Sequence, residues 1–123
     1  MTQLQSVDAY LADKDPGSVE LFLDFQRLVE RCGPSEVAPS RTIVYWKRKR
    51  VFAGAYIERK RLELNVDLLR EADHQCLLSA FHTTKRVVTH RLRVTDADQL
   101  DETLEALVAE AYDEVGPGTR RGL

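Results

Sequence analysis

Apolar side chains recur at helical spacing near the start of the chain. Ser6 precedes a short amphipathic stretch and is typical of the N-cap of a helical turn over residues 6–12. Asp15 and Pro16 mark a second start, because proline at the first helical position loses no intrahelical hydrogen bond. Over residues 19–32 the apolar side chains fall three and four apart, with charged residues on the opposite face. This spacing predicts a long helix that packs one face against a core.

The period changes to two between Thr42 and Val94. Leu62, Leu64 and Val66 alternate with polar residues, which places them on one face of a strand. Runs rich in β-branched and aromatic residues occur before and after this segment. Because the connections are short, we expect an antiparallel meander of about five strands. The predicted strands cover residues 42–47, 51–57, 62–68, 76–81 and 87–94.

A final apolar stripe predicts another helix. Thr95 stands three residues before Asp98, which is a capping box with aspartate in place of glutamate. Apolar residues then recur at helical spacing over residues 100–115, and we expect residues 116–123 to form a frayed tail. The order of elements predicts an α+β fold, a two-layer sandwich with the N- and C-terminal helices packed on one face of the sheet.

Length and composition narrow the class of protein. The 123 residues have the size of one domain, which we expect to cover residues 1–123 with its core at about 6–115. No apolar run approaches the ~20 residues that cross a bilayer, and the first residues lack the segments of a signal peptide. Cys32 and Cys76 lack the spacing of metal ligands, so we interpret them as buried thiols of a cytoplasmic protein without a membrane partner.

Four stretches, taken in order, resemble the bacterial domain-of-unknown-function 5655 family. They cover residues 25–34, 41–53, 62–68 and 89–101, and the likeness continues to Ala111 and Tyr112. The resemblance implies an α+β fold distantly similar to small bacterial domains that include frataxin-like iron chaperones. It implies no reaction and no cofactor. Arg41 stands where members often carry lysine, which keeps the charge and changes its geometry.

Charge is distributed unevenly along the chain. Residues 41–93 carry 13 basic and 5 acidic side chains, whereas the segments before and after them are acidic. In a meander, alternate turns share an end of the sheet, so Arg59–Arg61 should lie beside Lys85 and Arg86. We expect a patch that attracts an anionic ligand or nucleic acid. Its candidate residues are Arg41, Lys47, Arg48, Arg59, Lys60, Arg91 and Arg93. Charged turns that keep a sheet soluble are the alternative interpretation.

Acidic side chains and histidines offer a second hypothesis, which is metal handling. The last helix carries neighbouring carboxylates such as Asp98 and Glu102, and hard cations bind oxygen clusters. A solvated acidic face explains the same residues without a metal. Only His74 and Cys76 are close enough in sequence to share a metal, and we assign no metal ligand. His90 lies on the apolar side of its strand, at the rim of the core, where a partly buried histidine is the simpler interpretation.

Tyr45 and Trp46 are neighbours on one strand, so one should lie in the core and the other on the open face of the sheet. An exposed aromatic ring among basic residues can stack on a base. Core packing or a homodimer interface explains the same residues without a ligand, and we favour that interpretation. No phosphate-binding loop, nucleophile elbow or zinc motif is present, so the sequence favours a non-enzymatic binding module for an anionic partner over an enzyme.

Overall fold

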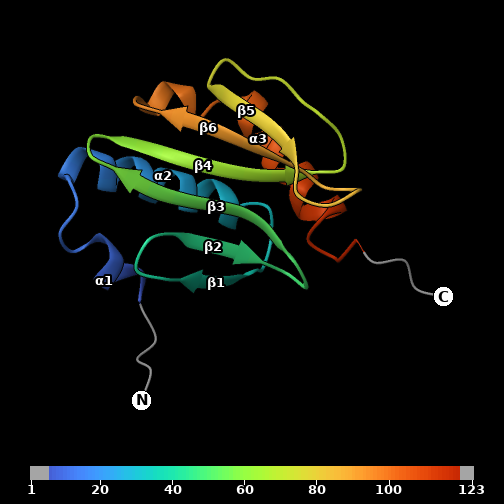
Figure 1. The fold of residues 1–123 in the computed structure, drawn as a ribbon. Coiled ribbons are helices and arrows are strands. Elements are labelled where there is room, and N and C mark those ends of the chain that lie inside the picture. The colour runs from blue at the N-terminus through green and yellow to red at the C-terminus, as the bar shows by residue number, and fades with distance from the viewer. Residues whose placement is uncertain (1–5, 120–123) are drawn as a thin grey trace.

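The computed structural model describes residues 6–119 of the chain. Three α-helices and six strands follow one another, with a short 3₁₀ helix before the last α-helix (Figure 1). The helices are α1 (Val7–Leu11), α2 (Pro16–Glu30), η1 (Ala97–Gln99) and α3 (Glu102–Glu114). The strands are β1 (Glu36–Pro39), β2 (Val44–Lys47), β3 (Val51–Glu58), β4 (Arg61–Leu68), β5 (Leu77–His82) and β6 (Val88–Val94).

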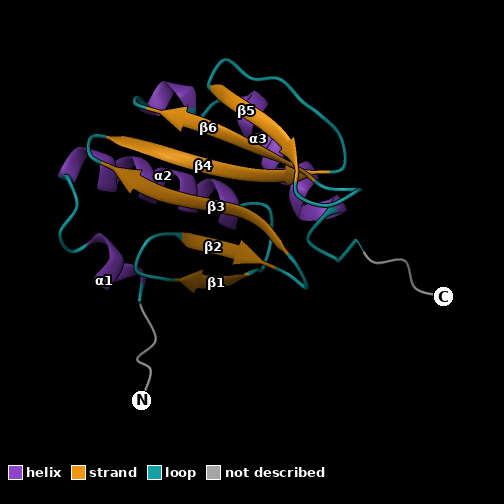
Figure 2. Ribbon diagram, in the orientation of Figure 1, coloured by secondary structure: helices purple, strands orange, loops and turns teal. Residues whose placement is uncertain are grey.

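The strands form one antiparallel sheet in the order β1-β2-β3-β4-β6-β5. Both α2 and α3 lie on the same face of this sheet, and no helix of residues 6–119 covers the opposite face (Figure 2). The predicted α+β sandwich is therefore confirmed, with six strands instead of about five. None of the helices between residues 6 and 119 is both long and apolar enough to span a bilayer.

Side-chain caps start the first two helices where the sequence predicts them. The Ser6 hydroxyl accepts a hydrogen bond from the Ala9 N–H at 2.9 Å and begins α1. The Asp15 carboxylate accepts from the Ser18 N–H at 3.1 Å and begins α2, with proline in the first turn. These bonds satisfy N–H groups that no earlier carbonyl in the helix can reach.

The strand that sequence reasoning missed is β1. It has four residues, ends at Pro39 and pairs with β2 at the edge of the sheet. Proline donates no ladder hydrogen bond, which confines it to such edges. The Ser40 hydroxyl closes the hairpin, because it donates to the Ile43 carbonyl at 2.8 Å and accepts from the Ile43 N–H at 3.2 Å. So short a segment shows no alternation from which a strand could be predicted.

The last two strands also depart from the predicted meander. β6 pairs with β4 on one side and with β5 on the other, so β5 is the outer strand. The loop over residues 69–76 runs back along the sheet before β5 begins (Figure 1). Most of β6 is buried in this inner position, whereas the outer strand β5 exposes Leu78 and Phe81.

This strand order changes which turns share an end of the sheet. We call the two ends the Arg59 end, which holds the β3–β4 turn, and the Lys49 end, which holds the β2–β3 turn. Leu68 of β4 pairs with Val88 of β6, so the β5–β6 turn lies at the Lys49 end. Lys85 and Arg86 therefore do not lie beside residues 59–61, and that prediction was wrong.

The core lies between the sheet and the two long helices. Trp46 is fully buried there, with its ring centroid 5.8 Å from that of Phe22 and 5.6 Å from that of Phe25. Such aromatic contacts add to the free energy gained by burying apolar surface. Trp46 is thus the core member of the predicted aromatic pair, and Tyr45 is the member on the open face. A ligand on the open face can stack on Tyr45 and not on Trp46.

The chain enters and leaves α3 differently from the sequence prediction. Asp96, and not Thr95, forms a capping box with Gln99, and this box starts η1. A second cap, Asp101, begins α3. After the helix, the Gly116 carbonyl accepts two backbone N–H groups of the β2–β3 turn, at 2.8 and 3.0 Å. Gly116 is therefore buried against this turn, whereas Pro117 and Gly118 are exposed, and residues 120–123 of the predicted tail lie outside the described residues.

Candidate anion-binding site

The open face of the sheet, which points away from α2 and α3, carries paired polar side chains. The register of β4 and β6 sets Glu63 opposite Arg93, and Asp67 opposite Thr89. Acidic residues of β4 therefore stand beside basic and hydroxyl side chains of β6. The charges that the sequence separates by about thirty positions are neighbours in space, and the open face is not uniformly basic.

Arg93 is held by a carboxylate. Its Nη2 lies 3.0 Å from Glu63 Oε1, and Arg61 Nε lies 3.7 Å from the same oxygen. Glu63 is only 4 % exposed, so the two guanidinium groups cover it. The hydrogen bond to Glu63 raises the pKa of Arg93. A buried carboxylate needs such partners. The charge of Arg93 therefore stabilises the fold by neutralising Glu63.

Two more of the predicted residues lie at the Lys49 end. Lys47 Nζ is 3.4 Å from Glu36 Oε2 across the β1–β2 pair. The Arg48 guanidinium donates to the Tyr112 carbonyl at 3.0 Å and lies 4.4 Å from the centroid of the Tyr112 ring. Tyr112 is in the last turn of α3, where free carbonyls favour a cation. Arg48 thus stabilises the end of a helix.

Arg59 and Lys60 form the β3–β4 turn at the opposite end. Arg59 has a φ of 57°, and its carbonyl accepts the Ser18 hydroxyl of α2 at 3.1 Å. Lys60 lines a cleft with Asp15, Glu20 and other acidic residues. The backbone of Arg59 therefore positions α2, and Lys60 lies in acidic surroundings.

Arg41 faces a pocket of about 480 Å³ at the Arg59 end. The pocket lies between α1, the β1–β2 turn and the end of β3, and we call it the Arg41 pocket. Its charged lining consists of Arg41, Lys14 and one carboxylate, Glu58. Among residues 6–119, no acidic side chain forms an ion pair with Arg41, and Lys14 pairs only with exposed Asp13. The lining is Tyr10, Lys14, Arg41, Thr42, Ile43, Tyr56, Ile57 and Glu58.

Two phenol groups add hydrogen-bond donors to the Arg41 pocket. The Tyr10 oxygen accepts the Ile57 N–H at 2.8 Å, and the Tyr56 oxygen accepts from Arg91 Nη2 at 2.8 Å. Each phenol thus keeps its own proton for another acceptor. Burial raises the pKa of Tyr10, so its hydroxyl stays protonated at neutral pH. Arg91 brings a third cation within one hydrogen bond of the lining.

The predicted residues therefore do not converge on one patch. Arg41 lines the pocket and Arg91 supports it through Tyr56, whereas Lys47, Arg48 and Arg93 bind other groups of the protein. Sequence reasoning missed Lys14 and Tyr10 as pocket residues. The only sequence signal for them is their position on a short helix, which does not say where that helix packs.

His90 belongs to the core and not to its rim. It is 1 % exposed, and its Nε2 accepts the Ala72 N–H at 2.9 Å. Its Nδ1 lies 3.2 Å from the Val66 carbonyl and donates to it. A neutral ring satisfies both contacts. The prediction of a partly buried position was wrong because the loop over residues 69–76 covers this end of the strand pair.

His74 and the acidic helix are likewise engaged within the protein. The His74 ring lies between Asp101 Oδ1, 2.9 Å from its Nε2, and the Cys76 N–H, 3.0 Å from its Nδ1. On α3, Glu105 binds Arg31 at 2.9 Å, and Glu110 binds Arg70 at 2.8 Å. Within residues 6–119, no three His, Cys, Asp or Glu side chains lie close enough together to hold a metal ion.

Comparison with known proteins gives one match, to a family model. No curated protein and no solved structure matches the chain at a significant level. The model of a family described as a domain of unknown function, DUF5655, matches residues 7–115. This match includes every element from α1 to α3 and the whole lining of the Arg41 pocket. The chain is a member of the domain-of-unknown-function 5655 family.

Proposed function

We propose that this protein is a non-enzymatic binding module, and that the Arg41 pocket takes a small anionic ligand with phosphate or carboxylate groups. Arg41 and Lys14 supply the charge, and the Tyr10 and Tyr56 hydroxyls donate hydrogen bonds to the same anion. Charge-assisted hydrogen bonds of this kind are about twice as strong as neutral ones. Two unpaired thiols, Cys32 and Cys76, support a reducing, cytoplasmic location.

One observation carries the proposal. Tyr10 is 3 % exposed and lines the pocket, while its oxygen already accepts the Ile57 N–H. Within residues 6–119, no hydrogen bond uses the proton of this hydroxyl. A buried donor without a partner costs about 1–3 kcal/mol. An anion in the pocket would accept this proton beside two cations.

The geometry favours a small ligand over a nucleic acid. A polyanion needs basic side chains spread along a continuous surface, because each neutralised phosphate adds to affinity. Here Glu63, Asp67 and Glu36 lie on the open face between the basic residues. A compact anion meets only the pocket, in which Glu58 is the one acidic lining residue.

Calorimetric titration with inorganic phosphate, pyrophosphate and citrate at low ionic strength tests the proposal. We expect saturable binding of at least one anion, and weaker binding as salt is added. Arg41→Gln and Lys14→Gln should each lower affinity about ten-fold, the loss of one charge-assisted hydrogen bond. Lys85→Gln is the matched control, because it makes the same charge change at the other end of the sheet.

Three results would overturn the proposal. One is the absence of binding by all three anions at low ionic strength. The other is an equal loss of affinity in Lys85→Gln and Arg41→Gln, which would mean that net charge and not the pocket attracts the anion. A third result is binding of a single-stranded oligonucleotide that depends on Lys85 and not on Arg41. That result would indicate a nucleic-acid-binding surface at the Lys49 end instead of an anion site in the pocket.

A further inference from the structure

A second hollow lies on the open face and shares no lining residue with the Arg41 pocket. It has a volume of about 290 Å³, and we call it the Tyr45 cleft. Its floor is formed by β4 and β6 and its sides by β2, β3 and the β5–β6 hairpin. A volume at the lower limit for small-molecule sites suits one ring system and not a chain. The lining is Tyr45, Arg50, Val51, Ala53, Asn65, Asp67, Phe81, Thr83 and Thr89.

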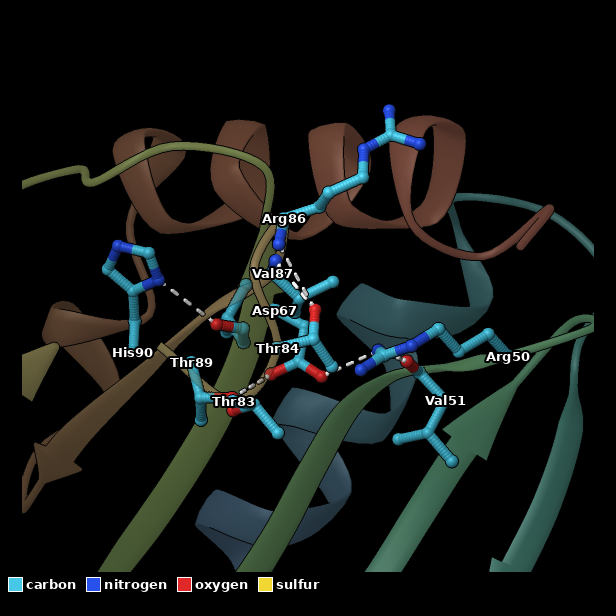
Figure 3. Close-up of polar contacts among 10 residues, drawn as sticks. Arg50, Val51, Asp67, Thr83, Thr84, Arg86, Val87, Thr89 and His90 are labelled. Carbon is cyan, nitrogen blue, oxygen red and sulfur yellow. Dashed lines mark hydrogen bonds and ion pairs between the residues drawn. The ribbon is translucent and has the colours of Figure 1, made fainter. Parts of the chain in front are cut away.

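The charged floor of the Tyr45 cleft is internally balanced. Asp67 accepts from Arg50 at 2.9 Å through one carboxylate oxygen and from the Thr89 hydroxyl at 2.7 Å through the other (Figure 3). The Thr89 hydroxyl also contacts that of Thr83. Because Arg50 neutralises Asp67 and donates to the Val51 carbonyl as well, neither charge is left for a ligand. The charged groups of the cleft therefore satisfy each other and do not attract an ion.

Asn65 is the exception in this satisfied network. Its Oδ1 is buried and has no hydrogen-bond partner in the described part of the chain. The side chain points to the open face between Gly54 of β3 and Arg91 of β6. A primary amide offers one acceptor and two donors side by side. An amide oxygen buried without a partner is rare in folded proteins and indicates a missing hydrogen-bond donor.

Aromatic rings flank the amide. The Tyr45 ring lies over Gly54, where a Cβ would come within 2.8 Å of Tyr45 Cδ1, so only glycine leaves room for it. From the other side, Phe81 of the edge strand β5 is 47 % exposed although it lines the cleft. Large apolar side chains that remain exposed at the rim of a cavity are typical of ligand contacts.

We propose that the Tyr45 cleft binds a neutral planar heterocycle with an N–H donor next to a ring-nitrogen acceptor, as on the edge of a nucleobase. The Asn65 amide pairs with that edge through two hydrogen bonds, as asparagine does with adenine. Phe81 and Tyr45 contact the ring as aromatic side chains that stack on bases do. This site is independent of the Arg41 pocket and needs no phosphate.

Adenosine is the probe, because it has an N–H donor next to a ring-nitrogen acceptor and carries no charge. We expect saturable binding by the purified protein in calorimetry or ligand-observed NMR. N6,N6-dimethyladenosine keeps the ring but cannot donate, so its affinity should be about ten-fold lower. Arg41→Gln should leave adenosine binding unchanged, which separates failure of this proposal from failure of the anion site.

Three variants test the residues. Phe81→Ser should weaken adenosine binding about ten-fold, whereas Leu78→Ser, equally exposed on the same strand, should not. Asn65→Leu should abolish the preference for adenosine over its dimethyl analogue. Its melting temperature should stay the same or rise, because a buried polar group without partners is removed.

Several outcomes would overturn the proposal. They are no saturable binding of adenosine at millimolar concentration, equal affinity for the dimethyl analogue, and equal effects of Leu78→Ser and Phe81→Ser. Self-association that Phe81→Ser abolishes, without adenosine binding, would assign the exposed ring to a second copy of the chain instead.

Discussion

The two ends of the sheet both carry clusters of basic residues but use them differently. At the Lys49 end, Arg48 binds the end of α3 and Arg50 binds Asp67. At the Arg59 end, Arg41 and Lys14 face a pocket with one acidic residue in its lining. The first cluster contacts groups of the fold itself, and we propose that the second binds a ligand. A run of charge in a sequence is therefore no measure of the charge that a partner can meet.

Of the four substitutions that follow, the one at Asp67 of the Lys49 end should lower the free energy of unfolding most. Asp67→Asn keeps the shape of the side chain and removes the charge that Arg50 and Thr89 contact. We expect the free energy of unfolding to fall by about 2 kcal/mol, because hydrogen bonds to partly buried charged groups are lost. Urea denaturation measures this change. A loss below about 0.5 kcal/mol, the scatter of surface substitutions, would contradict a structural role for this cluster.

Arg48→Met should have a smaller effect at the same end. Methionine keeps the apolar contact with the Tyr112 ring but not the hydrogen bond to its carbonyl. The free energy of unfolding should fall by about 1 kcal/mol, as for other cations at helix C-termini. Lys49→Met, which removes a neighbouring charge in the same turn, serves as the control. Equal destabilisation by both substitutions would refute a specific role for Arg48.

Acid should weaken the contact between His74 and Asp101. Burial alone would raise the pKa of Asp101, but hydrogen bonds from His74 and the Leu104 N–H outweigh it and lower the pKa below its ordinary 3.8. This contribution to stability is complete above the ordinary pKa and is lost as pH falls through the lowered one.

Asp101→Asn tests this linkage, because asparagine still caps α3 but cannot ionise. The variant should be less stable than the wild type by up to about 1 kcal/mol at pH 6, and this difference should shrink as pH falls below 3.8. Thermal unfolding across this pH range checks the expectation. A difference that does not shrink in acid would show that the charge of Asp101 is irrelevant.

The smallest effect on the free energy of unfolding is expected for a substitution at the Arg59 end. Arg41→Gln removes an exposed charge that pairs with no carboxylate of residues 6–119. Its free energy of unfolding should stay within about 0.5 kcal/mol of the wild type. The same urea experiment used for Asp67→Asn provides the comparison. A loss of 1 kcal/mol or more would mean that Arg41 serves the fold, as Arg48 does.

Local patterns predicted the helices and four interior strand segments well, because their signals lie in neighbouring residues. Ser6 and Asp15 mark real helix starts, and the alternation around Leu64 marks a real strand. What failed depends on contacts between distant residues. Pro39 pairs with β2 only because the hairpin brings it there, and the position of β6 between β4 and β5 depends on pairing between strands that are distant in sequence.

In the candidate site, too, local sequence signals predicted some residues, whereas contacts between distant residues decide the others. Arg41 was predicted from its charge, and the structure places it in a pocket. No sequence pattern links Arg93 to Glu63, because strand register decides that pair. Lys14 and Tyr10 reach the pocket through the packing of α1 against the end of β3, and the Tyr10–Ile57 hydrogen bond spans 47 positions. Local spacing carries no information about such a contact.

The most direct test is to map an anion onto the protein by NMR. Backbone and side-chain signals of isotope-labelled protein are followed as pyrophosphate is added, at constant pH and low ionic strength. We expect saturable shifts around Tyr10, Lys14, Arg41 and Tyr56, and none of comparable size at Arg48 or Lys85. Shifts confined to the Lys49 end, or spread evenly over all basic residues, would contradict it.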